Sequence, residues 1–333
     1  MDLRKLKAHR VTLTHDNDIG RRYVSNSKVR IPNVKYPYLV KTNAQGFRSN
    51  SEFFIKKNPN VKRILFLGDS NTAGDNVNNE YRFSDLVQQN LGFECYNFAV
   101  GGTGVDQHLL IYEKFAHNFE HDILVICPSL CDIARNMMKN RVEKDRTSGR
   151  NILVHKPFFR NDKGQLTLCN VPVPKPELVN GEVFQDIKEE QFKVNPIFWN
   201  ILNNYTPNMI KKLALKYHKK PLYKGFNNEK TREWVLTQAI IDRLINKAST
   251  KTIILMPLPE TRIYLNPNYQ VLFQKFSNIY DFVSFVDVEK YFMEYSEEKR
   301  EEFRYEYGHY SPKGHEVISS ALIDVFKNMN KKI

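Results

Sequence analysis

Three reactive residues far apart in this 333-residue chain could together carry nucleophilic catalysis. Ser70 follows an apolar run that ends in a tight turn, within RILFLGDSNTAG at residues 63–74, while Glu306 and His309 lie near the other end of the chain. A serine hydroxyl becomes a nucleophile when a base takes its proton. A histidine base in turn needs an acceptor that fixes its tautomer and stabilises the imidazolium. The sequence therefore predicts His309 as the base for Ser70, with Glu306 orienting it.

A glycine-rich segment could supply the hydrogen-bond donors that this chemistry needs. Acyl transfer develops negative charge on the carbonyl oxygen, and preorganised N–H groups stabilise that charge. We expect the backbone N–H groups of Ser70 and Gly102 to serve, because glycine lets the backbone approach a ligand closely. Gly101, Gly102 and Gly104 could instead form a phosphate loop. Their spacing is not Gly-x-Gly-x-x-Gly, however, and they follow the second expected strand rather than the first.

Hydrophobic periodicity predicts a scaffold that would bring these residues together. We expect strands at residues 63–68, 93–100, 122–128, 252–256 and 283–286, alternating with helices at 81–91, 105–119, 232–248, 267–279 and 312–329. Strands that alternate with helices predict a three-layer α/β/α fold with a parallel sheet. Ligands of such sheets bind beyond the carboxyl ends of the strands. The reactive residues all lie in segments expected at that edge.

Two segments fall outside this alternation. Residues 1–50 are polar and basic, and we expect short extended pieces that form an arm packed on a main domain at residues 51–330. Residues 137–231 interrupt the alternation and are interpreted as an insertion between two halves of one sheet. Within the insertion, the stretch around residues 161–164 predicts a hairpin.

Four separated blocks carry a resemblance: Gly68-Asp69-Ser70, the segment from Asn97 to Gly102, Ser129-Leu130-Cys131-Asp132, and Glu306-Tyr307-Gly308-His309 followed by Ser-Pro-x-Gly-His. They resemble the SGNH (GDSL-type) hydrolase family. The connecting segments NAQGFRS, GGTGVDQHLL and KPFF…GQL…NVPVPK resemble a bacterial subset of it whose substrates are often unassigned. The resemblance spans about residues 40–330. It implies a flavodoxin-like three-layer fold, Ser70 as nucleophile, Gly102 as an oxyanion donor, and no metal or organic cofactor.

The chain departs from the family pattern at two positions. The third block usually contains an asparagine whose amide donates to the oxyanion, and here that position is Cys131, a weak donor. Asn136 and Asn71 are candidate substitutes. The last block usually begins with aspartate, whereas this chain has Glu306, whose longer side chain needs adjusted geometry.

Three further polar residues near these blocks are expected to be structural. We expect Asp69 to hydrogen-bond backbone groups of its own turn and Asp132 to hold the loop of the third block. We expect His315, near the start of the last helix, to pack against the core or cap that helix.

Composition narrows the class of partner. The chain has 50 Lys and Arg against 37 Asp and Glu, a formal net charge of +13, which favours an anionic substrate such as an acidic glycan ester. The basic residues are dispersed and no motif of a nucleic-acid reader is present, so we expect no specific nucleic-acid partner.

Four cysteines without a CxxC pair and a first segment without an apolar run predict free thiols and a cytoplasmic location. No apolar run is long enough to span a membrane, and the sequence leaves the oligomeric state open.

These features favour a serine esterase that removes an acyl group, such as acetyl, from a carbohydrate or similar polar substrate. Two alternatives remain open. An O-acyltransferase would use the same site with a sugar hydroxyl in place of water. A weak or inactive glycan-binding protein on the same fold would be consistent with Cys131.

Overall fold

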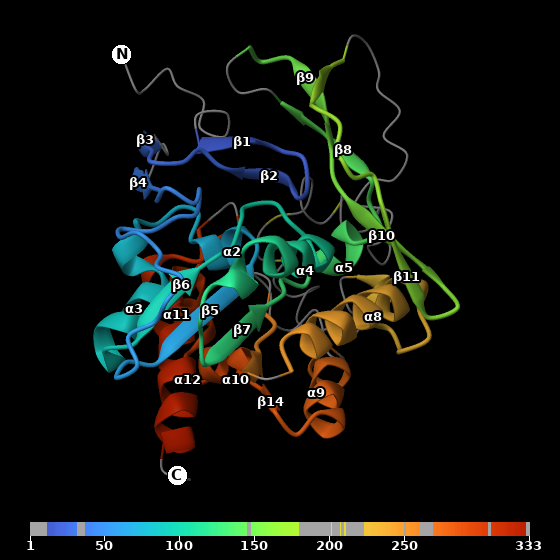
Figure 1. Ribbon diagram of the computed structural model, residues 1–333. Coiled ribbons are helices and arrows are strands. Elements are labelled where there is room, and N and C mark those ends of the chain that lie inside the picture. Colours follow the sequence, from blue (N-terminus) through green and yellow to red (C-terminus); the bar gives the residue numbers. More distant parts are fainter. Residues whose placement is uncertain are drawn as a thin grey trace.

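The computed structural model describes residues 12–31, 37–144, 148–179, 201, 207, 210, 223–249, 251–259, 269–305 and 308–330 (Figure 1). At its centre lies a five-stranded sheet with the order β14-β13-β7-β5-β6. These strands are β5 (Arg63–Gly68), β6 (Glu94–Asn97), β7 (Ile123–Cys127), β13 (Thr252–Leu255) and β14 (Val283–Phe285). All their pairings are parallel. Numbered along the chain, the order is 2-1-3-4-5, which is the flavodoxin-like order.

The alternation of side chains along β5 explains the two helical layers. Ile64 and Phe66 point to one face, where they pack in a core with three helices, and Leu65 and Leu67 point to the other face. The helices of the first face are α3 (Phe83–Leu91), α10 (Val288–Met293) and α12 (Pro312–Asn330). Those of the second face are α4 (Val105–Lys114), α8 (Arg232–Lys247) and α9 (Tyr269–Ile279). The predicted three-layer α/β/α fold is therefore confirmed.

Short helices complete the described chain. They are α2 (Ser70–Ala73), α5 (Asp132–Arg135) and α11 (Glu297–Arg300), together with the 3-10 turns η1 (Asn79–Tyr81), η2 (Ala116–Asn118), η4 (Lys224–Phe226) and η6 (Glu301–Phe303). No helix in these described ranges is both long and apolar enough to cross a membrane. All four cysteines are free thiols.

The strand expected at residues 93–100 is shorter than predicted. It ends at Asn97, whose Oδ1 accepts a hydrogen bond from the Ala99 N–H at 3.0 Å. The Asn97 amide donates to the Thr72 carbonyl at 2.7 Å and to Ser84 Oγ at 2.9 Å. This local side-chain bond takes up the Ala99 N–H at the end of the strand. The buried run Phe98–Val100 is not part of the strand but stays beside β5, because the Phe98 N–H donates to the Phe66 carbonyl at 2.9 Å and the Val100 N–H to the Gly68 carbonyl at 3.2 Å.

The described residues between 12 and 50 contain two antiparallel strand pairs. They are β1 (Leu13–Asp16) with β2 (Gly20–Tyr23), and β3 (Lys28–Ile31) with β4 (Tyr38–Lys41). Ile19, Tyr23 and Phe47 from this segment are buried in the same core cluster as the α4 face of the sheet. The N-terminal segment therefore contributes side chains to the main core.

The segment between α5 and α8 contains two further antiparallel units. One is the sheet β12-β9-β8, from β8 (Asn140–Lys144), β9 (Asn151–His155) and β12 (Glu177–Leu178). The other is the predicted hairpin, β10 (Phe158–Asp162) with β11 (Gln165–Cys169), which turns at Lys163 and Gly164, both with positive φ. Strands β1, β2, β8 and β9 lie at one end of the molecule, opposite the C-terminal end of α12 (Figure 1).

The buried His315 makes the stability of this fold depend on pH. His315 is fully buried, its ring lies 5.7 Å from that of Phe83, and its Nδ1 accepts a hydrogen bond from the Phe83 N–H at 3.3 Å. Burial, with the nearby Arg82 and Arg48, lowers the pKa of His315 to about 3. Its expected role as a packing residue agrees with this position.

We predict that the protein loses stability as the pH falls below about 6.5, the pKa of an unperturbed histidine. Below that pH the unfolded chain binds a proton at His315, whereas the folded chain does not until about pH 3. For this one histidine the loss between pH 7.5 and pH 5.0 amounts to about 2 kcal/mol. Urea unfolding at both pH values, on wild type and His315→Met, measures it. The difference between the two pH values should shrink by that amount in the variant; an unchanged difference would contradict the prediction.

Candidate active site

The structure brings Ser70 and His309 into hydrogen-bond contact, with Ser70 Oγ 2.9 Å from His309 Nε2. Ser70 opens α2 directly after β5, at the carboxyl edge of the sheet. Asp69 caps α2, since its Oδ1 accepts the Asn71 N–H at 2.9 Å, and Gly74 closes the helix in the left-handed conformation. The capped turn therefore fixes the serine at the point where the buried strand ends.

His309 is presented by a tight loop before α12. The Tyr305 N–H donates to the His309 carbonyl at 2.9 Å, and the flanking Arg304 and Tyr310 form an antiparallel bridge. The Tyr310 hydroxyl donates to the Pro259 carbonyl at 2.6 Å, and Arg304 donates to the same carbonyl. The loop is thus anchored to the segment that follows β13, and this anchor directs the imidazole toward Ser70.

The second nitrogen of His309 has no partner within the described part of the chain. Its Nδ1 is buried and makes no hydrogen bond there. Glu306, the predicted orienting residue, lies outside the described residues. A buried imidazole nitrogen without a partner is costly, so an acceptor at this position is what the site requires.

A cluster of buried charges lies directly beneath the serine turn. Arg135 Nη1 donates to Asp69 Oδ2 at 2.8 Å and to Asp132 Oδ1 at 3.0 Å. Ser129 Oγ donates to Asp69 Oδ1 at 2.8 Å, and the Ser129 N–H donates to Asp132 Oδ2 at 2.9 Å. The structure therefore places Asp69 and Asp132, the two expected structural carboxylates, on one guanidinium that joins the loops after β5 and β7.

Burial and the neighbouring charges shift the pKa values of Asp69 and Asp132 in opposite directions. Burial alone would raise the pKa of Asp69, but Arg135 and the Ser129 hydroxyl outweigh it, so the pKa of Asp69 is lowered. Burial and the neighbouring Asp69 raise the pKa of Asp132. Cys131 Sγ lies within 4.8 Å of ligand atoms of both carboxylates, a grouping that could hold a metal ion. The cation between these carboxylates is already the Arg135 guanidinium, and we assign no metal here.

The two backbone N–H groups expected as oxyanion donors belong to residues that lie close together. Gly101 and Gly102 form a turn beside the serine, because an ideal Cβ at Gly101 would lie 3.7 Å from Ser70 Cβ. Gly102 has φ +76°, a conformation that favours glycine. Within the described ranges, neither the Ser70 N–H nor the Gly102 N–H donates to a protein acceptor. Both donors are available to a ligand.

The side chains considered as further donors have other partners. Asn136, a predicted substitute, is buried; its Nδ2 donates to Thr237 Oγ1 at 2.8 Å and its Oδ1 accepts the Asp106 N–H at 3.2 Å. Asn71 Nδ2 donates to Ser129 Oγ at 3.1 Å. Cys131 is buried, with Sγ 4.0 Å from Asp132 Oδ1. The geometry thus argues against Asn136, whose amide holds α4, α5 and α8 together.

Sequence reasoning missed a pair of arginines at this edge. Arg141 of β8 approaches Gly102 so closely that an ideal Cβ there would lie 2.5 Å from Arg141 Nη2. Arg141 Nε pairs with Glu143, and Arg21 of β2 donates to the same carboxylate at 2.7 Å. The two-residue spacing of Arg141 and Glu143 places both on one face of a strand and signals their pairing. No sequence signal connects them to Gly102.

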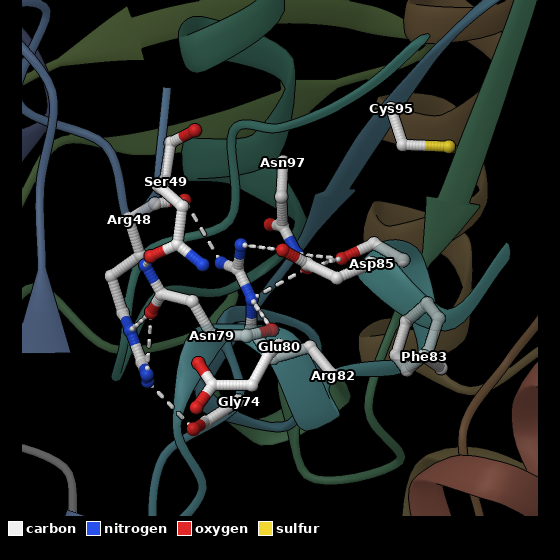
Figure 2. A network of polar contacts seen from close by, with 12 residues as sticks. Arg48, Ser49, Gly74, Asn79, Glu80, Arg82, Phe83, Asp85, Cys95 and Asn97 are labelled. Carbon is white, nitrogen blue, oxygen red and sulfur yellow. Dashed lines mark hydrogen bonds and ion pairs between the residues drawn. The ribbon is translucent and has the colours of Figure 1, made fainter. Parts of the chain in front are cut away.

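The buried Arg48 holds the segment that follows α2 (Figure 2). Arg48 is fully buried and donates to the Gly74 carbonyl at 2.6 Å, to the Val77 carbonyl at 2.7 Å and to Asn79 Oδ1 at 2.9 Å. Arg82 donates to the Arg48 carbonyl at 2.9 Å. Figure 2 shows Arg48 reaching Gly74 and Asn79, and this contact ties the N-terminal segment to the end of the serine turn.

Solved structures of similar fold include three lipolytic enzymes or esterases. A member of the lipolytic G-D-S-L family from Veillonella parvula has 10% identity and a TM-score of 0.43, covering 80% of this chain and 99% of that chain. A lipase/acylhydrolase from Enterococcus faecalis has 12% identity and a TM-score of 0.42, covering 81% and 97%. A psychrotrophic esterase from Pseudoalteromonas sp. has 11% identity and a TM-score of 0.40, covering 81% and 99%.

No protein-family model matches the chain, and no curated protein matches it in sequence. The family name of the Veillonella parvula structure is the one that the sequence blocks resemble. These identities and TM-scores are low, so the activity proposed below rests on the geometry of this chain.

We predict that Arg48→Met lowers the free energy of unfolding by about 3 kcal/mol, since it leaves buried carbonyls without a donor. Arg30→Met is the matched control, because Arg30 is exposed on β3. The control should change stability by no more than ~0.5 kcal/mol. Urea unfolding of both variants at neutral pH provides the comparison, and equal stabilities would contradict the role given to Arg48.

Proposed function

We propose that this protein is a serine esterase that removes an acyl group, most simply acetyl, from a carbohydrate or similar polar substrate. One observation carries the proposal. Ser70 Oγ and His309 Nε2, from opposite ends of the chain, lie 2.9 Å apart at the carboxyl edge of a parallel sheet. A hydroxyl within hydrogen-bond reach of an imidazole is the arrangement that activates a serine nucleophile.

The first half of the reaction forms an acyl-enzyme. Ser70 Oγ attacks the ester carbonyl carbon while His309 Nε2 takes the hydroxyl proton. The negative charge that develops on the carbonyl oxygen is stabilised by the N–H groups of Ser70 and Gly102. As the tetrahedral intermediate collapses, the bond to the alcohol breaks and His309 returns the proton to the leaving oxygen. In this proposal Glu306 accepts from His309 Nδ1 and orients the ring.

The second half releases the acyl group. Water attacks the acyl-enzyme with His309 as base, and the carboxylic acid leaves as Ser70 regains its proton. An acyltransferase would pass through the same acyl-enzyme, with a sugar hydroxyl attacking in place of water. Both activities therefore depend on the same two residues.

The charges around the site support a polar, anionic substrate. Arg21 and Arg141 share the single carboxylate of Glu143 beside Gly102, which leaves one uncompensated positive charge among these three groups. The chain as a whole carries a net charge of +13. Ionised side chains beside Gly102 favour a substrate with a polar alcohol over one with a long apolar acyl chain. The cytoplasmic location stays a prediction from the sequence.

We predict that Ser70→Ala and His309→Gln each lower acetate release from glucose pentaacetate by ~10³-fold or more, because each removes one half of the nucleophile–base pair. Acetate is measured with a coupled enzymatic assay. Ser51→Ala and His117→Gln change exposed residues of the same types and serve as matched controls. Both controls should retain wild-type rates.

Equal rates for wild type and Ser70→Ala would contradict the esterase. If wild type also released no acetate from any activated ester, the glycan-binding alternative would be favoured, since Cys131 replaces the family's usual amide donor. Binding of acidic oligosaccharides by wild type, measured by calorimetry, would then test that alternative.

A further inference from the structure

We propose that Arg141 completes the oxyanion hole, in the role that an amide side chain fills in the family and that Cys131 cannot fill here. The inference rests on the proposed esterase function and assigns it a third donor. It concerns a residue of β8, in the segment that interrupts the α/β alternation, and not one of the four sequence blocks.

The site lacks a third donor from the expected positions. Ser70 and Gly102 offer backbone N–H groups, whereas the thiol of Cys131 is a weak donor. The Asn136 amide donates to Thr237, and the Asn71 amide donates to Ser129. Removal of one oxyanion donor costs roughly 10²–10³ in rate. An esterase with this site therefore needs a donor from elsewhere.

Arg141 lies where such a donor is needed. Its Nη2 is 2.5 Å from the position of an ideal Cβ on Gly102. Because Cβ and N of one residue are about 2.5 Å apart by standard bond geometry, Nη2 lies within about 5 Å of the Gly102 nitrogen. The Gly102 turn in turn lies against Ser70, through Gly101. The guanidinium thus lies against Gly102, next to the glycine that lies beside Ser70.

The arginine is held by the pairing of its Nε with Glu143, and its terminal nitrogens are the atoms closest to Gly102. Its Nε pairs with Glu143, which also accepts from Arg21 Nη2 at 2.7 Å. A guanidinium carries five N–H donors, so Arg141 keeps donors beyond the Nε that pairs with Glu143. The side chain is only 24% exposed, so its position is restricted by packing as well as by Glu143. Its guanidinium is therefore held in place beside Gly102 as a donor.

The close approach of Arg141 is a second feature that favours glycine at position 102. A Cβ there would displace the Arg141 guanidinium, so the close approach of the two residues depends on the missing side chain. A guanidinium keeps its proton throughout the reaction. It would hydrogen-bond the carbonyl oxygen as the negative charge forms and weaken its hold as the intermediate collapses, with no proton transferred.

Arg141→Gln tests the assignment on two esters of one leaving group, the neutral 4-nitrophenyl acetate and the carboxylate-bearing 4-nitrophenyl succinate. We expect kcat and kcat/KM to fall together by about 10²-fold on both esters, with KM changed less than ~3-fold. Arg160→Gln removes a positive charge from an exposed position of the same segment and should leave both esters unaffected. Arg141→Lys keeps the charge without the planar fork and should recover part of the lost rate.

Each of the following results would overturn the inference. Unchanged kcat in Arg141→Gln would show that the hole is complete without this residue. A loss confined to KM for the succinate ester would make Arg141 a binding residue for a substrate anion instead. A wild type that turns over neither ester would remove the esterase function itself and the inference with it. If circular dichroism shows that Arg141→Gln does not fold, the rates of Arg141→Lys are compared with wild type instead. Wild-type rates in Arg141→Lys would contradict a role for the planar guanidinium.

Discussion

The site depends on one guanidinium that pairs with two buried carboxyl groups under the Ser70 turn. Asp69 and Asp132 follow adjacent strands, β5 and β7, and both are almost completely shielded from water. Removing such charges from water is costly unless they are paired and hydrogen-bonded. Arg135 pairs with both, and Ser129 donates to each of them. Since Asp69 also caps the helix that begins with Ser70, the position of the serine follows from this pairing.

The chemistry of the site is assembled from segments that the core alone would not bring together. Ser70 comes from the first strand of the parallel sheet and His309 from the loop before the last helix, held by the Pro259 carbonyl. Arg21 and Arg141 come from segments outside the α/β alternation and meet on Glu143. The scaffold thus supplies the proposed nucleophile and base, and the additions supply positive charge beside Gly102. This division lets one fold keep its chemistry while its additions change specificity.

The sequence predicts the scaffold well because its strands are continuous apolar runs and its helices have one apolar face. It also predicts the meeting of Ser70 and His309, since both lie in loops at the same sheet edge. It does not predict the end of β6, where the Asn97 side chain accepts the Ala99 N–H, or the role of Asn136, whose partner Thr237 lies about a hundred residues away. Arg141 could not be predicted either, because its approach to Gly102 depends on how β8 docks.

The central claim is that His309 activates Ser70. It is tested most directly by the intact mass of the protein after treatment with a fluorophosphonate, which reacts with activated serines. The account predicts one adduct on wild type, located at Ser70 by peptide mapping, and none on Ser70→Ala or His309→Gln in the same time. An adduct that persists in Ser70→Ala, or a wild type that never reacts, would contradict it.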